Sequence, residues 1–141
     1  MNDIGKPAHN PCPVTFALEV FGDRWTLLVL RDVLLEGRYS YKELLAANPG
    51  IATNVLADRL KRLEQRQLVT KTRDPSDARQ FVYKPTHLGI SVIPMLVEMM
   101  VWGSKHGNAQ ATTSLVERFE SDRESLLLEL KKAATKKARL D

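Results

Sequence analysis

The residues best suited to bind another molecule lie in one predicted helix, from Thr53 to Arg66. Its leucines fall within about 60° of one another at helical spacing, so they are expected to face the core. These leucines are Leu56, Leu60 and Leu63. The side chains that then point outward are Asn54, Asp58, Lys61 and Gln65, with Arg59 and Arg62 on one flank. Asparagine pairs with adenine through two hydrogen bonds, and lysine or arginine binds guanine or phosphate. The polar row is therefore a candidate for reading bases in the major groove of DNA.

An ordinary amphipathic helix with a solvated charged face has the same pattern, and this alternative stays open. Thr53 is placed equally well to contact DNA or to cap the helix, and Arg59, which adjoins the leucines, is expected to form an ion pair inside the protein. Neighbouring basic residues, among them Arg73, favour nucleic acid. The residues that we predict to contact DNA are Ser40, Tyr41, Lys42, Thr53, Asn54, Asp58, Lys61, Arg62 and Arg79.

Positive charge is concentrated in the middle of the chain. The chain has 141 residues and a net charge of +4, of which residues 1–37 contribute −2, residues 38–85 contribute +5 and residues 86–141 contribute +1. The length is that of one domain. A local excess of positive charge suits a polyanion such as nucleic acid, although a solvated basic surface gives the same count.

The apolar spacing predicts a mainly α-helical fold with one small β-hairpin. The predicted helices are 13–21, 23–35, which should be a central core helix, 41–47, 53–66, 87–102 and 114–138. Strands are expected at 68–73 and 80–84, with a very short one at 38–39, and Ser40 and Thr86 are expected to cap the helices that follow them. Short helices followed by a hairpin are typical of a winged helix-turn-helix, in which the helix before the hairpin enters the major groove.

Several sequence blocks carry a resemblance to a known family. They are Cys12-Pro-Val, Gly22 to Leu35 with its Trp-Thr-Leu-Leu run, Tyr41-Lys-Glu-Leu44, Gly50-Ile51, and Leu56-Ala-Asp-Arg-Leu-Lys-Arg-Leu-Glu64. Over about residues 10 to 105 the chain resembles the HxlR family of bacterial winged-helix transcription regulators. The resemblance implies a homodimeric DNA-binding regulator whose wing lies between the two main predicted strands.

The chain departs from the family pattern at two positions. Gln67 stands where the family usually has glycine, so a left-handed conformation there is expected to be strained. Pro85 stands where leucine is more frequent, at the exit of the second strand. We divide the chain into an N-terminal arm (1–12), a winged helix-turn-helix domain (13–107), and a C-terminal helix with a basic tail (108–141).

The predicted helix at 87–102 carries two apolar rows, and a small domain is expected to cover only one. One row is Leu88, Val92, Leu96 and Met99, and the other is Ile90, Ile93, Val97 and Val101. A second copy of the chain would bury the remaining row, which predicts flanking dimerisation helices, supported by an apolar stripe in the last helix. The alternative is that helices of the same chain cover both rows. We expect no membrane span, because the stretch is shorter than about 18 residues and is interrupted by Ser91, Pro94 and Glu98.

Cys12 is the only cysteine and directly precedes Pro13, which places its thiol at the start of the first predicted helix. The helix dipole favours a thiolate there, so Cys12 is a candidate sensor of oxidants or electrophiles. The resemblance adds that some family members sense such compounds at this position. A disulfide would have to be intermolecular, and the alternative response is an adduct. The competing interpretation is a small side chain buried in a dimer interface.

The sequence gives little support for a catalytic site or a metal site. The histidines His9, His87 and His106 stand in no catalytic motif, and His9 with Cys12 would supply only two metal ligands. We therefore expect no enzyme activity, no cofactor and no metal. With no secretory signal visible, a cytoplasmic location is expected. A small-molecule effector remains open, and the alternative function is a winged-helix protein-interaction module without specific DNA binding.

Overall fold

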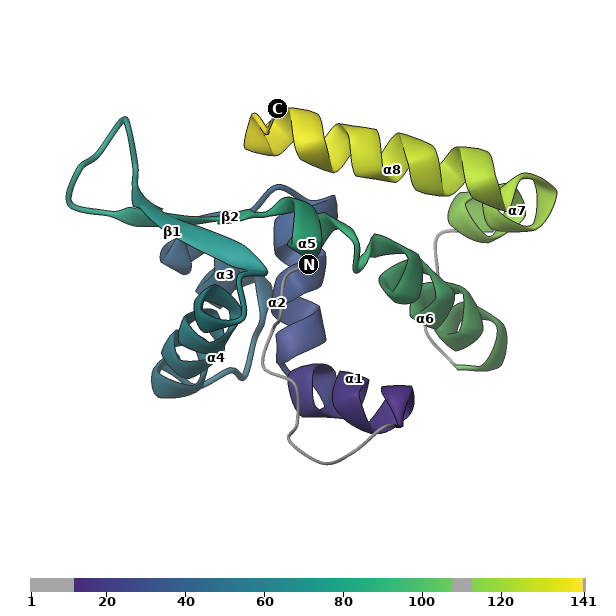
Figure 1. Ribbon diagram of the computed structural model, residues 1–141, viewed down its shortest axis with the longest axis horizontal. Helices are drawn as coiled ribbons and strands as arrows, with labels where there is room; N and C mark the ends of the chain where they lie inside the picture. Colours follow the sequence, from purple (N-terminus) through teal and green to yellow (C-terminus); the bar gives the residue numbers. More distant parts are fainter. Residues whose placement is uncertain (1–11, 108–112, 141) are drawn as a thin grey trace.

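The computed structural model describes residues 12–107 and 113–140. The elements are α1 (Pro13–Phe21), α2 (Thr26–Leu35), α3 (Tyr41–Ala47), α4 (Thr53–Gln65), β1 (Val69–Arg73), β2 (Phe81–Pro85), α5 (His87–Ile90), α6 (Ile93–His106), α7 (Thr113–Ser121) and α8 (Arg123–Ala138). In Figure 1, α2 stands at the centre, with α3, α4 and the hairpin on one side and α6 and α7 on the other. α8 crosses above α5 and α6. The predicted mainly helical winged helix-turn-helix is confirmed.

Helix α2 is the predicted core helix, because its side chains are buried on most of its circumference. Val29, Leu30, Val33 and Leu34 belong to the hydrophobic core. Asp32 is also fully buried, and its carboxylate accepts hydrogen bonds from the guanidinium groups of Arg31 and Arg38 and from Nδ2 of Asn48. A buried carboxylate is tolerated only with such partners, so this group joins α2 to the loops on either side of α3.

Helix α3 is attached to the wing at its first turn. The Ser40 hydroxyl accepts from the backbone N–H of Glu43 at 3.1 Å and lies 2.9 Å from Oε1 of the same residue, so the predicted cap is confirmed. The short strand expected at 38–39 is reduced to one bridge, between Ser40 and Val82. The backbone N–H of Tyr83 also donates to the carbonyl of Tyr39 at 2.8 Å. The wing therefore has a fixed position relative to α3.

The end of α4 sends the chain into the hairpin through a left-handed residue. Gln67 has φ of 62°, the left-handed conformation that the family resemblance implied. Its N–H donates to the carbonyl of Glu64, and the N–H of Leu68 donates to the carbonyl of Leu63, each at 2.9 Å. This arrangement terminates the helix and turns Leu68 and Val69 into the core. β1 then pairs with β2 antiparallel, with Val69 opposite Pro85.

The two helices predicted after the hairpin are each split. The segment at 87–102 divides into α5 and α6, since Pro94 has no N–H to bond the carbonyl of Ile90 and its ring crowds that position. α6 continues through Gly103, past the predicted end at residue 102, and is capped by Gly107. The last helix divides into α7 and α8 at Asp122, whose carboxylate accepts from the N–H of Ser125 at 3.1 Å. Asp122 starts a new helix instead of continuing the old one.

The chain itself covers most of both apolar rows of α5 and α6, which corrects the expectation that one row stays open. Ile93, Val97 and Val101 are buried, and so are Val92 and Leu96 of the other row. The expected length was also too short, since residues 87–106 are 20 residues of mean hydropathy 1.3 and could cross a membrane by length and composition alone. One such segment is weak evidence for a membrane, and this one is broken between α5 and α6.

Candidate nucleic-acid interface

Helix α4 presents its predicted polar row to solvent. Leu56, Leu60 and Leu63 are fully buried, and the opposite side exposes Asn54, Asp58, Lys61 and Gln65. α4 lies at the edge of the molecule below the hairpin (Figure 1), so both can approach one surface. The expected orientation of these residues is confirmed.

Arg59 forms the internal ion pair that its position predicted. Its Nε donates to Oδ1 of Asp23 at 2.9 Å. The same carboxylate accepts from the backbone N–H groups of Trp25 at 2.8 Å and Thr26 at 3.0 Å. Partial burial opposes ionisation of Asp23, but hydrogen bonds from the Thr26 hydroxyl, these N–H groups and Arg59 lower its pKa to about 2. The carboxylate thus caps the start of α2 and holds α4 against it.

Asp58, one of the residues expected to contact DNA, forms ion pairs with two arginines of its own helix. Its Oδ2 accepts from Nε of Arg62 at 3.1 Å, one helical turn away, and also from Arg59. A carboxylate would repel DNA phosphates if it stood alone, but here it lies between two guanidinium groups. Its position suits orienting Arg62, whose side chain is exposed, better than reading a base.

Three residues predicted to contact DNA lie at the start of α3 or just before it, and they differ in how far they are exposed. Ser40 is only 8% exposed and its hydroxyl caps the helix, so it has a structural role, and its contact with DNA stays a prediction. The Tyr41 hydroxyl donates to the carbonyl of Thr53 at 3.0 Å, which ties α3 to α4. Lys42 is exposed. The N-cap of α4 is Ala52, so Thr53 is the first helical residue and its interpretation as the cap is wrong.

The tip of the wing has a defined shape. The Asp74 carboxylate accepts from the N–H of Ser76 at 2.9 Å and from its hydroxyl at 2.8 Å, and these bonds lower the pKa of Asp74. Asp77 accepts from the N–H of Arg79 at 3.1 Å. These turns present the Arg79 side chain, which is 90% exposed. Its contact with Asp77, at 3.2 Å, is a surface ion pair of little strength.

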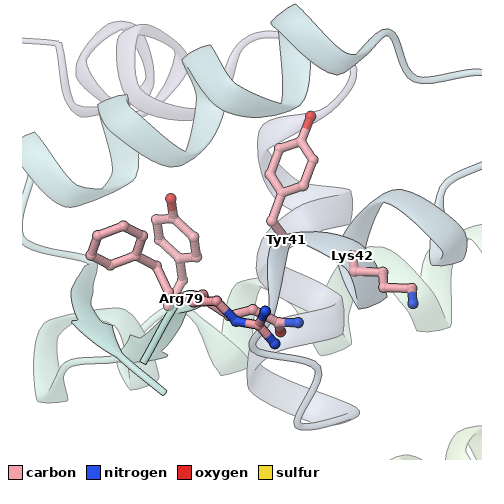
Figure 2. A pocket seen from close by; sticks show the side chains of 6 residues that line it. Tyr41, Lys42 and Arg79 are labelled. Carbon is pink, nitrogen blue, oxygen red and sulfur yellow. The ribbon is translucent and has the colours of Figure 1, made fainter. Parts of the chain in front are cut away.

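A cavity of about 380 Å³ lies between α3 and the wing. It is lined by Tyr41, Lys42, Arg79, Gln80, Phe81 and Tyr83. Figure 2 shows Tyr41 and Lys42 on α3 with the Arg79 side chain reaching toward them from the hairpin. Phe81 and Tyr83 were not predicted as functional. The signal available was the strand alternation, which places both aromatic rings on one face of β2.

Cys12 is the N-cap residue of α1, as predicted, and its side chain is exposed. Hydrogen bonds from the N–H and hydroxyl of Thr15 and from the N–H of Val14 lower the pKa of its thiol. This is the anion-stabilising effect of a helix N-terminus. His9 lies outside the described residues. Within residues 12–107 and 113–140, no three His, Cys, Asp or Glu side chains are grouped to hold a metal ion.

Comparisons with known proteins agree with this geometry. The model of the HxlR-like helix-turn-helix family matches residues 20–111. The HTH-type transcriptional regulator YodB of Bacillus subtilis (strain 168) is 32% identical over 95 residues, which cover 67% of this chain and 84% of YodB. An HTH-type regulator of Synechocystis, sll1512, is 31% identical over 93 residues, covering 66% of this chain and 68% of that protein.

Solved structures of transcription factors are also similar to this chain. The candidate transcription factor PA1607 has a TM-score of 0.66 at 30% identity, over 74% of this chain and 72% of that one. Reduced YodB has a TM-score of 0.57 at 30% identity, over 70% of this chain and 97% of YodB. YodB has also been solved after diamide treatment and bound to a quinone. Since the matched segment contains α4 and the wing, this chain belongs to the HxlR family of helix-turn-helix transcription regulators.

Proposed function

We propose that this regulator binds an inverted repeat in duplex DNA as a homodimer, in the cytoplasm and without enzyme activity. The observation that carries the proposal is the exposed polar row of α4. The opposite face of this helix is buried in the core, and Arg59 on its flank is hydrogen-bonded to Asp23. A row that is both exposed and rigidly held is what direct readout of bases requires. The basic wing beside it supplies contacts to phosphate.

The residues divide into base-reading, backbone-binding and positioning roles. Asn54 and Lys61 project from the exposed face of α4 and are assigned to base edges. Thr53, Tyr41, Lys42, Arg62 and Arg79 surround them and are assigned to the sugar-phosphate backbone. Asp58 orients Arg62, and Ser40 fixes the start of α3.

The dimer is proposed from apolar side chains that the single chain leaves open. On α1, Val14 and Leu18 are 65% and 60% exposed, and on α6 Met99 and Trp102 are 53% and 68% exposed. Large side chains at such exposure are typical of a surface that a partner covers. A two-fold dimer places two copies of α4 in successive major grooves, which predicts the inverted repeat. In sequence order, the proposed division of the chain is an arm (1–12), the winged domain (13–107) and a C-terminal unit (108–141).

The proposal is tested by selecting binding sites from a randomised duplex pool with the wild-type protein. We expect a recovered consensus with two-fold symmetry, bound with at least about a thousandfold preference over random duplex. A protein-interaction module with a winged-helix fold would retard all duplexes weakly and equally. That outcome would refute the proposal.

A redox or electrophile response through Cys12 is proposed as the signal. Two observations favour it: the thiol is exposed with a lowered pKa at the start of α1, and Val14 and Leu18 on the same helix belong to the proposed dimer surface. Modification of two symmetric thiols would alter how the two winged domains are spaced. A few kcal/mol of difference between two dimer arrangements changes DNA affinity by orders of magnitude.

A further inference from the structure

The cavity between α3 and the wing has a chemistry that duplex DNA alone does not explain. Three of the side chains that line it are aromatic, namely Tyr41, Phe81 and Tyr83. Phe81 is an apolar ring with 37% of its surface exposed, at the base of a wing that is otherwise polar. Phosphate contacts require cations and hydrogen-bond donors, and they do not require an exposed phenyl ring. The aromatic lining therefore indicates a second kind of ligand.

Cations surround these rings. In the hairpin, Arg73 lies opposite Phe81 and Lys71 opposite Tyr83, so all four side chains share one face. Lys71 Nζ lies 4.3 Å from the centroid of the Phe81 ring, and Arg73 Cζ lies 4.8 Å from the same centroid. These contacts hold the ring in place by cation–π attraction. The result is a preformed aromatic surface in a positive field.

The lining also provides partners for an anion. Lys42 and Arg79 contribute positive charge, and none of the six lining residues, all within the described part of the chain, is acidic. The competing partner of Arg79 is Asp77, in an exposed ion pair that an incoming anion can replace. Figure 2 shows Lys42 and Arg79 on the two sides of the space next to Tyr41.

We infer that this cavity binds a small aromatic carboxylate of one or two rings, with its ring against Phe81 and Tyr83 and its carboxylate at Lys42 and Arg79. The volume of about 380 Å³ is within the range of small-molecule sites. Tyr41, Lys42 and Arg79 are also assigned to the DNA backbone, so ligand and DNA exclude one another. This last step rests on the proposed function, whereas binding of the carboxylate does not.

The test uses 2-naphthoate as the probe and the full-length protein labelled with ¹⁵N. We expect saturable shifts of the backbone amide signals of residues 41–42 and 79–83. Two matched compounds separate the ring from the charge: 2-naphthalenemethanol keeps the ring without the charge, and inorganic phosphate keeps the charge without the ring. Each compound is expected to bind at least about tenfold more weakly than 2-naphthoate, because it loses one of the two interactions. Shifts centred elsewhere, or equal binding of phosphate, would overturn the inference.

Two variants test the assignment. Phe81→Leu keeps an apolar side chain in the strand but removes the ring, and we expect about tenfold weaker binding of 2-naphthoate. Lys42→Gln should weaken it similarly, whereas Lys132→Gln, at an exposed position on α8, should have no effect. Unchanged affinity in Phe81→Leu, in a protein whose spectrum shows an intact fold, would refute the site.

Competition is measured with the selected duplex. In the wild type, saturating 2-naphthoate should raise the apparent Kd for DNA by about tenfold or more, and in Phe81→Leu the same concentration should raise it much less. Unchanged DNA affinity with the probe bound would refute the exclusion. If the untreated protein fails to select any duplex, the proposed function is wrong. If it binds the duplex but not the probe, only the present inference is wrong.

Discussion

Nε of Arg59 lies 2.9 Å from Oδ1 of Asp23, and this contact joins α4 to a residue 36 positions earlier in the chain. Asp23 also accepts the first backbone N–H groups of the core helix α2. One carboxylate therefore sets both where α2 begins and how α4 lies against it. The charge of Arg59 is therefore used inside the protein, whereas Lys61 on the same helix is exposed.

Replacing Asp23 with Asn should destabilise the protein and weaken DNA binding, because Arg59 loses its partner and α2 its ionised cap. The pKa of Asp23 falls from its ordinary 3.8 to about 2 on folding. A lowered pKa stabilises the fold above the unfolded value, so this contribution is complete above about pH 4 and disappears as the pH falls toward 2. Urea midpoints between pH 2 and 6 should drop steeply in the wild type and less in Asp23→Asn. Glu120→Gln, which removes an exposed ion pair with Lys105, should follow the wild type.

Asn54 and Arg79 should have different effects on DNA binding. Asn54→Ala is expected to lose about 1–3 kcal/mol at one base pair of each half-site and to relax selection there. Arg79→Ala should weaken binding to all sequences and reduce the slope of log K against log salt by about 1 for each protomer. Fluorescence anisotropy over a salt series measures both effects. If Asn54→Ala selects the same consensus with the same stringency, the assignment of the base-reading residue is wrong.

Trp102 is the residue with which to test the homodimer. Trp102→Lys should weaken association by roughly thirtyfold or more, because it places a charge in an apolar contact. Thr70→Lys places the same charge at an exposed position of β1, outside this apolar surface, and it should leave the dimer intact. Light scattering at micromolar concentration reads out both variants. Val97 and Val101, which belong to one of the two apolar rows of the helix, are unsuitable because they are buried within the chain itself. A wild-type monomer at that concentration would contradict the proposal.

Cys12 should be alkylated faster than an ordinary thiol at neutral pH, because hydrogen bonds from Thr15 and Val14 lower its pKa. Treatment with diamide or a quinone should then change the affinity of the wild type for the selected duplex. Reductant should reverse the change where a disulfide between two protomers has formed, and Cys12→Ser should not respond at all. The rate of alkylation against pH tests reactivity, and anisotropy tests function. Identical responses of wild type and Cys12→Ser would show that the signal enters elsewhere.

Gln67→Gly should stabilise the protein. Gln67 has φ of 62°, a conformation that glycine adopts without strain, while the larger entropy loss of glycine offsets part of the gain. The expected net effect is about 0.5–1 kcal/mol in the free energy of unfolding, measured by urea denaturation. Gln67→Ala retains the strain and should show no such gain. Equal stabilisation by both variants would rule out the backbone conformation as the cause.

Local patterns were sufficient to predict much of this molecule. The buried leucines and the polar row of α4 follow from helical periodicity, which decides which side of a helix is apolar before any partner is known. The caps at Ser40 and Thr86 depend only on neighbouring residues, whereas the left-handed Gln67 was expected from the family resemblance. The breaks at Pro94 and Asp122 also had local signals, a missing N–H and a capping carboxylate, which the continuous apolar spacing outweighed.

Other features depend on how distant elements pack, and periodicity carries no information about that. The position of Arg59 indicated an internal ion pair, but its partner Asp23 became known only when α4 was placed against the start of α2. Both apolar rows of α5 and α6 looked too extensive for one chain, yet the chain covers most of them. Phe81 reads as an ordinary strand residue, yet 37% of its surface stays exposed in the fold. The apolar pattern specifies which side of a helix or strand is buried, whereas the packing of the whole chain decides which residues bury it.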